Sequence, residues 1–343
     1  MRRRAIAFAL LSAALFGAST PLAKLLLGST SPLLLAGLLY LGAGIGLAAW
    51  LGARGGFKPI PRGDWPWLGA AVVAGGIFGP ALLMFGLART DGATASLLLN
   101  LEAVFTAVIA WVAFRENVDR RVFAGMLAIV AGGVILSFEA MPTSESFKGQ
   151  ILISAACLAW ALDNNFTRRI SGGDAATLAC VKGLVAGSVN FGLALIQNAA
   201  IPAPGFVAMA GVVGLLGYGV SLAFFIVALR DLGTARTAAY FSVAPFFGAA
   251  LALVLLAETP GVAFWVAAAL MALGVWLHIS ERHGHAHTHE PIAHEHEHVH
   301  DEHHRHEHDF AWDGREPHTH PHQHGALTHT HPHHPDLHHR HRH

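Results

Sequence analysis

The residues most able to do chemistry are polar side chains that lie inside long apolar stretches. Glu102 is about halfway along the apolar segment 93–114, with Asn100 just before it and Thr106 one helical turn after it. A charged side chain at the centre of a membrane helix costs roughly 2.5–3.5 kcal/mol, so such a residue is a functional candidate. The carboxyl group could exchange a proton or bind a substrate amine. The alternative is a structural hydrogen bond to a neighbouring helix.

A run of three polar residues, Asp163, Asn164 and Asn165, interrupts the apolar segment 149–170. Adjacent residues of a helix point in different directions, because successive positions are about 100° apart around its axis. Two interpretations follow. Either the helix is broken at this run, as helices of secondary transporters can be, or at least two of the three side chains bond to neighbouring helices.

Lys182 lies in the apolar segment 174–198, where Gly183 and Gly187 would let another helix come close. Asp163 and Lys182 stand at about equal distances from the centre of the loop that joins their helices. With a rise of about 1.5 Å per residue, they should reach similar depths. We therefore expect a buried ion pair between them. The alternative for Lys182 is to extend toward the cytoplasmic surface.

The end of the chain offers metal-binding chemistry. All 25 histidines lie at or after His278, most of them in a polar tail at 281–343. Imidazole binds Zn, Ni, Cu and Co, so we expect this tail to bind a divalent transition metal, with no cofactor required by the rest of the chain. Its low complexity and lack of apolar periodicity predict disorder. The candidate ligands are His283, His285, His287, His289, His294, His296, His298, His300, His303, His304, His306 and His308.

The elements that position the polar residues are predicted to be membrane-spanning helices. Charged residues make up 13% and hydrophobic residues 53% of the 343 residues, whereas soluble proteins have about 25% charged residues. A helix needs about 20 apolar residues to cross the bilayer core. The composition predicts an all-α membrane protein in a lipid bilayer, with no enzyme activity and no nucleic-acid partner. Ten segments come near the required length: 5–27, 32–52, 65–88, 93–114, 120–138, 149–170, 174–198, 206–230, 234–257 and 260–280.

An internal repeat organises these segments. The sequence ATASLLLNLEAVFTAVIAWVAFRE at 93–116 shares its layout with ARTAAYFSVAPFFGAALALVLLAE at 235–258, which lies 142 positions later (235 against 93). Both begin with small and hydroxyl residues and end on glutamate. We therefore expect two diverged five-helix repeats, 1–140 and 141–280, followed by the tail at 281–343. An odd number of helices inverts the second repeat, which is an architecture of secondary transporters.

Lysine and arginine residues in the short loops predict the orientation. With the N-terminus inside, the outer loops hold Arg89 and Lys148, and the inner side collects nearly all the others. We expect a multi-pass protein of the bacterial cytoplasmic (inner) membrane with both termini in the cytoplasm. Apolar sequence continues to Leu27, which favours an uncleaved first helix over a signal peptide. The inner set is Arg2, Arg3, Arg4, Arg54, Lys58, Arg62, Arg115, Arg120, Arg121, Arg168, Arg169 and Arg230.

Several of these segments together resemble a known family. LFGASTPLAKLLL in the first segment, ASLLLNLEAVFTAVIAWVAFRE in the fourth, AWALDNNFTRR in the sixth and APFFGAALALVLLAE in the ninth look like the EamA family of the drug/metabolite transporter superfamily. The resemblance covers about 5–280 in two copies. It implies ten helices and the transport of small organic solutes, such as amino acids, nucleosides and related metabolites.

Three functions remain open at this point. The first is a permease that moves a small metabolite by alternating access, with proton coupling as an option. The second is a Ni, Co or Zn permease that uses the histidine tail to collect or sense the ion, so the substrate is a small molecule or an ion. The third is a membrane-anchored metal buffer or sensor. A homodimer is left open.

Overall fold

The computed structural model describes residues 2–114, 120–139, 144–232, 237, 240–280, 284–289, 292–298, 318–324 and 327–332. The chain divides into two compact units. The helical unit comprises Met1–Glu281, and the tail unit comprises Arg282–His343. The two predicted repeats therefore pack together in one unit.

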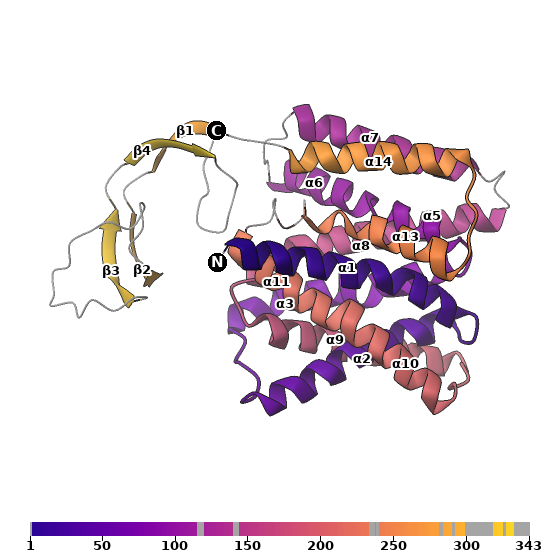
Figure 1. Cartoon of the computed structure of the whole chain (residues 1–343). Coiled ribbons are helices and arrows are strands. Elements are labelled where there is room, and N and C mark those ends of the chain that lie inside the picture. Colours follow the sequence, from indigo (N-terminus) through magenta and orange to yellow (C-terminus); the bar gives the residue numbers. More distant parts are fainter. Residues whose placement is uncertain are drawn as a thin grey trace. The chain divides into compact units, whose positions relative to one another are not determined.

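The helical unit contains a helical segment at each of the ten predicted spans, as far as the structure describes the chain (Figure 1). The all-α membrane fold is confirmed. The elements of the first five spans are α1 (Arg2–Leu27), α2 (Pro32–Ala53), η1 (Arg62–Asp64), α3 (Trp65–Ala71), η2 (Val72–Phe78), α4 (Gly79–Leu87), α5 (Gly92–Leu98), α6 (Leu101–Phe114) and α7 (Arg120–Glu139). The second five contain α8 (Ser144–Ile170), α9 (Ala175–Ile196), α10 (Pro204–Gly214), η3 (Leu215–Val220), α11 (Ser221–Leu232), α13 (Ala244–Leu255) and α14 (Val262–Ile279).

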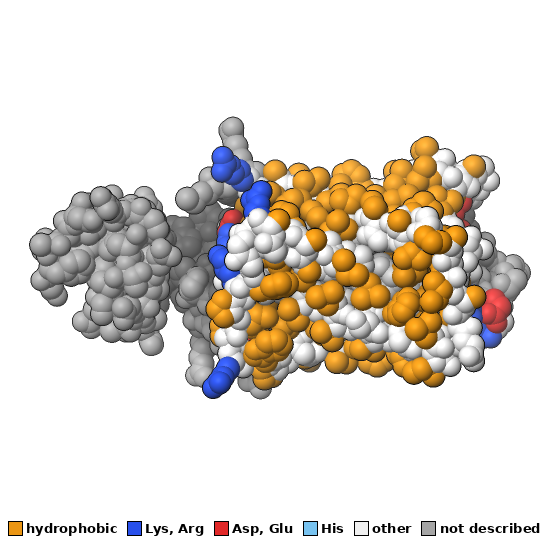
Figure 2. Space-filling model, turned by 90° about the horizontal axis from the view of Figure 1, so that it is seen from below, with side chains coloured by type: hydrophobic (Ala, Val, Ile, Leu, Met, Phe, Trp, Pro, Cys, Tyr) orange, Lys and Arg blue, Asp and Glu red, His pale blue; other side chains and the backbone are white. Residues whose placement is uncertain are grey.

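Six of the described segments are long and apolar enough to cross a membrane. Shorter apolar helices cover Phe123–Phe138, Ala244–Leu255 and Val262–Leu277. Figure 2 shows the matching surface, with hydrophobic side chains over the side of the helical unit and most of the visible Lys and Arg at one end. A surface of this kind fits a lipid bilayer, because apolar side chains face hydrocarbon and charged groups stay in the interfaces.

The fourth and ninth spans are interrupted at equivalent positions. α5 and α6 are separated by a turn at Leu99 and Asn100, and a second turn at Ser242 and Val243 precedes α13. Asn100 and Ser242 are 142 positions apart (242 against 100), the offset of the repeat. Glu102 therefore lies in the first turn of α6, and not halfway along one unbroken helix as expected. The turn is closed by short-range bonds such as Glu102 N to Leu99 O, 3.1 Å.

The third and eighth spans share a second irregularity. η2 and η3 are π-helical segments that lie at the same offset, and each contains glycines. π-Helical turns are rare and are often found at functional sites. A Cβ added at Gly75 in η2 would overlap the Asp163 carboxylate, and one added at Gly217 in η3 would overlap Ser19. Glycine at these two positions lets another helix come close.

The predicted close approach at Gly183 and Gly187 is confirmed. α9 packs along α2, and a Cβ added at Gly183 would come within 2.7 Å of the backbone nitrogen of Gly44. At Gly187 the added Cβ would meet the backbone of Tyr40 and Leu41. Small residues let the two helices touch through their backbones, which favours association in lipid.

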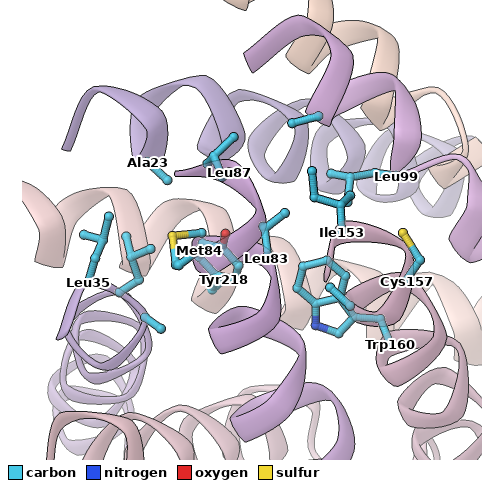
Figure 3. Close-up of a cluster of buried hydrophobic side chains, with 14 of the residues drawn as sticks. Ala23, Leu35, Leu83, Met84, Leu87, Leu99, Ile153, Cys157, Trp160 and Tyr218 are labelled. Atoms are coloured by element: carbon cyan, nitrogen blue, oxygen red, sulfur yellow. The ribbon is translucent and has the colours of Figure 1, made fainter. Parts of the chain in front are cut away.

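The core joins elements of both predicted repeats, as Figure 3 shows. Leu83, Met84 and Leu87 of α4 are fully buried beside Ile153 of α8. The two cysteines, Cys157 and Cys180, are free and buried. Their thiols donate to the backbone oxygens of Leu98 (3.6 Å) and Gly44 (3.2 Å), so they serve packing.

The described residues of the tail unit form four short strands, β1 (Gly284–His289), β2 (Ile292–His298), β3 (His318–His324) and β4 (Leu327–Pro332). β1 pairs antiparallel with β4, and β2 with β3. The composition predicts disorder for the tail, and within it the structure describes strands at these residues. Their alternating His-x-His pattern has the two-residue period of a strand.

Candidate functional site

The predicted ion pair is present at the centre of the site. Lys182 of α9 donates from Nζ to Oδ2 of Asp163 in α8. Thr167 donates to the other carboxylate oxygen at 3.0 Å. Asp163 is 5% and Lys182 4% exposed, so Lys182 does not extend to the surface. A buried charge needs such a partner, because leaving it unpaired would cost several kcal/mol.

Glu102 is bonded to the second residue of the polar run. Asn164 Nδ2 donates to Glu102 Oε1 at 2.7 Å, which joins α6 of the first predicted repeat to α8 of the second. α8 continues unbroken through the run Asp163–Asn165. Of the two interpretations of this run, bonding to neighbouring helices is therefore the one that the structure supports.

Two adjoining cavities collect five of the six predicted residues. We call the first the glutamate cavity, of about 40 Å³, and the second the ion-pair cavity, of about 60 Å³. Both are lined by Phe16, Glu102, Asn164, Phe225 and Phe241. Asn100 lines the glutamate cavity, and Asp163 and Lys182 line the ion-pair cavity.

Asn165 stays apart from these five residues. It is buried, but it lines neither cavity, and its Nδ2 donates to Ala161 O within the same helix at 2.8 Å. Asn100 makes a similar local bond to Leu97 O at 3.0 Å. The difference is position, because Asn100 lies at the break before α6 and lines the glutamate cavity.

Aromatic residues of the site were not among the predicted site residues. Tyr40 Oη and Trp160 Nε1 both donate to Gly75 O in η2, at 3.0 and 2.9 Å. Phe16 makes ring contacts with Trp160, Tyr218 and Phe241, with centroids 5.4 to 5.9 Å apart. A usable signal was present in the sequence, since only three tyrosines occur in the chain and two of them line the ion-pair cavity.

One end of the helical unit is held by two further ionic groups. Glu258 accepts from the backbone nitrogens of Gly92 (2.7 Å) and Ala93 (2.8 Å) at the start of α5. Lys24 donates to Leu87 O (2.6 Å) and Thr90 O (2.8 Å) where α4 ends. These contacts satisfy helix-terminal groups that have no partner within their own helix.

No group of three or more His, Cys, Asp or Glu side chains that could hold a metal ion occurs among the described residues. The candidate ligands in the tail divide into two sets. The backbone positions of His285, His287 and His289 lie in β1, and those of His294, His296 and His298 lie in β2. The others, His283, His300, His303, His304, His306 and His308, lie outside the described residues.

Comparison with known proteins identifies the family. The profile of the EamA-like transporter family matches this chain twice, at 3–138 and at 147–280. The chain belongs to this family. Together with the fold and the apolar surface, this makes it a multi-pass membrane transporter of the drug/metabolite transporter kind.

Similar proteins agree with this membership. An uncharacterized transporter of Methanothermobacter thermautotrophicus is 27% identical over 282 residues, which is 76% of this chain and 82% of the relative. A probable 4-amino-4-deoxy-L-arabinose-phosphoundecaprenol flippase subunit ArnE of Pseudomonas paraeruginosa is 38% identical over 117 residues, 32% of this chain and 99% of that subunit. A solved crystal structure with a TM-score of 0.62 and 19% identity covers 81% of this chain and 96% of its own, which shows that the fold is shared.

Proposed function

We propose that this EamA-like transporter is a secondary transporter that moves a small organic metabolite across the membrane by alternating access. One observation carries the proposal. A buried polar site, made of Glu102, Asn164, Asp163 and Lys182, lies beside breaks in two helices and draws residues from both predicted repeats. Substrate sites of inverted-repeat transporters lie at the repeat interface near the membrane centre.

The small size of the two cavities supports a mechanism in which the surrounding helices move. A water molecule needs roughly 10–15 Å³ of cavity volume. Cavities of about 40 and 60 Å³ therefore hold only a few waters each. A metabolite enters only when the surrounding helices move apart. The breaks before α6 and α13 are suited to this, because a turn bends more easily than a continuous helix.

We propose that Glu102 also exchanges the coupling proton. Asp163 already has Lys182 as an ionic partner, whereas the only side-chain partner of Glu102 in the described residues is the neutral amide of Asn164. A carboxylate in that position gains most from taking up a proton when no substrate is bound. An imposed proton gradient should therefore drive transport in the wild type and should not drive it in Glu102→Gln.

The test of transport uses the purified full chain in proteoliposomes. The vesicles are incubated with a defined mixture of amino acids, nucleosides and amines, and their contents are measured by mass spectrometry. We expect at least one solute to accumulate above empty liposomes, and Glu102→Gln to lose that accumulation. A wild-type protein that is folded and moves no organic solute would contradict the proposal.

The relative ArnE is named as a subunit of a flippase for a lipid-linked amino sugar. That substrate belongs to the relative, whose matching region covers about a third of this chain. We propose only the shared step, in which a polar group passes through a buried site between helices. For the transition-metal permease, no group of three or more His, Cys, Asp or Glu side chains that could hold the ion is found among the described residues.

We propose a location in the bacterial cytoplasmic membrane with both termini in the cytoplasm. The support is the distribution of Lys and Arg, with Arg54, Arg120, Arg168 and Arg230 at helix ends that fall on one side of the predicted topology. Reporter fusions after Ser280 and within the 140–143 connection should give opposite sides. The same side for both would contradict this orientation.

We further propose that the tail binds a divalent transition metal and tunes the transporter. The strand registers place histidines opposite one another, such as His287 with His329 and His296 with His320. Protons compete with metal for imidazole, whose unperturbed pKa is about 6.5, so affinity should fall as pH falls. Truncation after Ser280 should abolish binding of Zn or Ni and leave basal transport in place. Intact metal binding after truncation would contradict the proposal.

A further inference from the structure

The two cavities carry an unequal set of charges. Among the described residues that line them, the carboxylates are Glu102 and Asp163, and the cation is Lys182. Lys182 is bonded to Asp163, which also has the hydroxyl of Thr167 on its second oxygen. The negative charge that has no ionic partner there is the Glu102 carboxylate, whose Oε1 accepts from Asn164.

Two further side chains of the glutamate cavity carry buried oxygens that can accept hydrogen bonds. Asn100 is 1% exposed, and its Nδ2 donates to Leu97 O, which leaves Oδ1 as the free end of the amide. Among the described residues, that buried Oδ1 has no hydrogen-bond partner, and neither has the hydroxyl oxygen of Thr106. A buried acceptor without a donor is costly, about 1–3 kcal/mol. A hydrogen-bond donor in this cavity would satisfy these oxygens, and a donor that carries positive charge would also pair with the Glu102 carboxylate.

Aromatic rings also line the two cavities. Phe16, Phe225 and Phe241 line both cavities, with Phe16 and Phe241 at 5.4 Å and Phe225 and Phe241 at 4.8 Å between centroids. Aromatic faces attract cations and also pack against apolar groups. The three rings are apolar, so they offer no polar competitor for the Glu102 carboxylate.

We propose that the glutamate cavity binds the ammonium group of an amphipathic organic amine, with Glu102, Asn100 and Thr106 accepting its N–H bonds and the phenylalanine rings holding its apolar part. This deepens the proposed function and rests on it, since the amine is the transported substrate class. An anion would meet an unneutralised carboxylate here. A neutral ligand would be bound with Glu102 protonated, whereas an ammonium group pairs with the ionised carboxylate.

The test compares three probes of one shape with the full chain in detergent. The probes are 2-phenylethylamine, its neutral isostere 2-phenylethanol and the anion phenylacetate, and affinity is measured by calorimetry. We expect the amine to bind at least about tenfold more tightly than the alcohol, because a charge-assisted hydrogen bond is about twice as strong as a neutral one. Phenylacetate should bind most weakly.

Variants separate the role of the carboxylate from general damage. Glu102→Gln keeps the shape and should reduce amine affinity to about that of the alcohol. Asn100→Ala should give a smaller loss. Glu258→Gln, which changes a carboxylate outside both cavities, is the matched control and should bind the amine as the wild type does. A melting temperature close to that of the wild type shows that each variant is folded.

The outcomes also distinguish this inference from the proposed function. Equal affinity for the amine in wild type and Glu102→Gln, or tighter binding of phenylacetate, overturns the inference. If the proteoliposomes then carry a neutral or anionic solute, the transporter proposal stands without it. Glu102-dependent amine binding in a protein that moves no solute supports the ammonium site and overturns transport.

Discussion

The fourth and ninth spans share a break in the backbone helix but differ in the side chains at that break. The break before α6 carries Asn100 and Glu102, and the equivalent positions before and within α13 are Ser242 and Ala244. All four residues line the glutamate cavity. The break is therefore a property of the repeated fold, whereas the carboxylate belongs to one repeat. A symmetrical framework can thus present an asymmetrical site.

The same contrast holds where the π-helical segments meet the first helix of the opposite repeat. Gly75 of η2 lies against Asp163 in α8, and Gly217 of η3 lies against Ser19 in α1. In one repeat the close approach positions an ionised pair, and in the other it positions a neutral hydroxyl. One repeat therefore contributes charged side chains at this contact, and the other contributes a neutral side chain.

The largest effect is expected from breaking the charged half of this comparison. Asp163→Asn or Lys182→Met alone should lower the free energy of unfolding by about 3–5 kcal/mol, because each leaves a buried charge unpaired. The double variant should lose less than either. Denaturant titration of the protein in detergent measures this. Ser19→Ala, at the neutral counterpart, is the control, and equal losses in single and double variants would contradict the explanation.

A smaller effect should follow from closing the glycine contacts. Gly75→Ala and Gly217→Ala both overpack a helix contact, which costs typically about 1–3 kcal/mol. We expect the larger loss at Gly75, because the new methyl group meets a carboxylate that is fixed by Lys182. Gly52→Ala in α2 meets nothing within 4 Å and serves as the control, measured by the same titration. A larger loss of unfolding free energy in Gly217→Ala than in Gly75→Ala would contradict this expectation.

The glutamates that end the two repeated segments allow a third test. Glu258 accepts from two backbone nitrogens of α5, so Glu258→Ala should cost about 1 kcal/mol, as removal of a helix cap typically does. Glu258→Gln keeps an acceptor oxygen and should lose less. Glu116, its counterpart, lies outside the described residues. A melting curve of Glu116→Ala would show whether the two ends are equivalent.

The smallest effect is expected from exposed charges, which set the baseline for the buried pair. Glu145 accepts from Lys148 at 2.7 Å and Arg89 at 3.2 Å, and these hydrogen bonds, Lys148 first, lower the pKa of its carboxyl group. A lowered pKa stabilises the folded state above the ordinary value of 4.5 and ceases to do so as pH falls through the lowered value.

Because all three side chains are exposed and screened by salt, Glu145→Gln should leave the melting temperature at neutral pH within error. Any difference from the wild type should shrink further below pH 4.5. Melting curves at two salt concentrations check this. A loss as large as that of Asp163→Asn would show that burial is not what separates the two clusters.

The sequence by itself determined the spans, the repeat and the ion pair. Apolar segments of membrane length are a local property, and the lipid leaves a helix few other conformations. The Asp163–Lys182 contact was also predictable, because the two residues lie on neighbouring helices joined by a short loop, so counting from that loop gives their relative depth.

The tertiary structure alone decided which polar groups meet across distant segments. Asn164 and Asn165 are indistinguishable by pattern, and their different partners depend on how α8 is rotated against α6. The break at Leu99 and Asn100 contains no proline or glycine from which it could have been predicted. Phe16 meets Trp160, Tyr218 and Phe241 only after four helices pack together. Rotation and packing depend on all neighbouring side chains at once, so no local pattern could specify them.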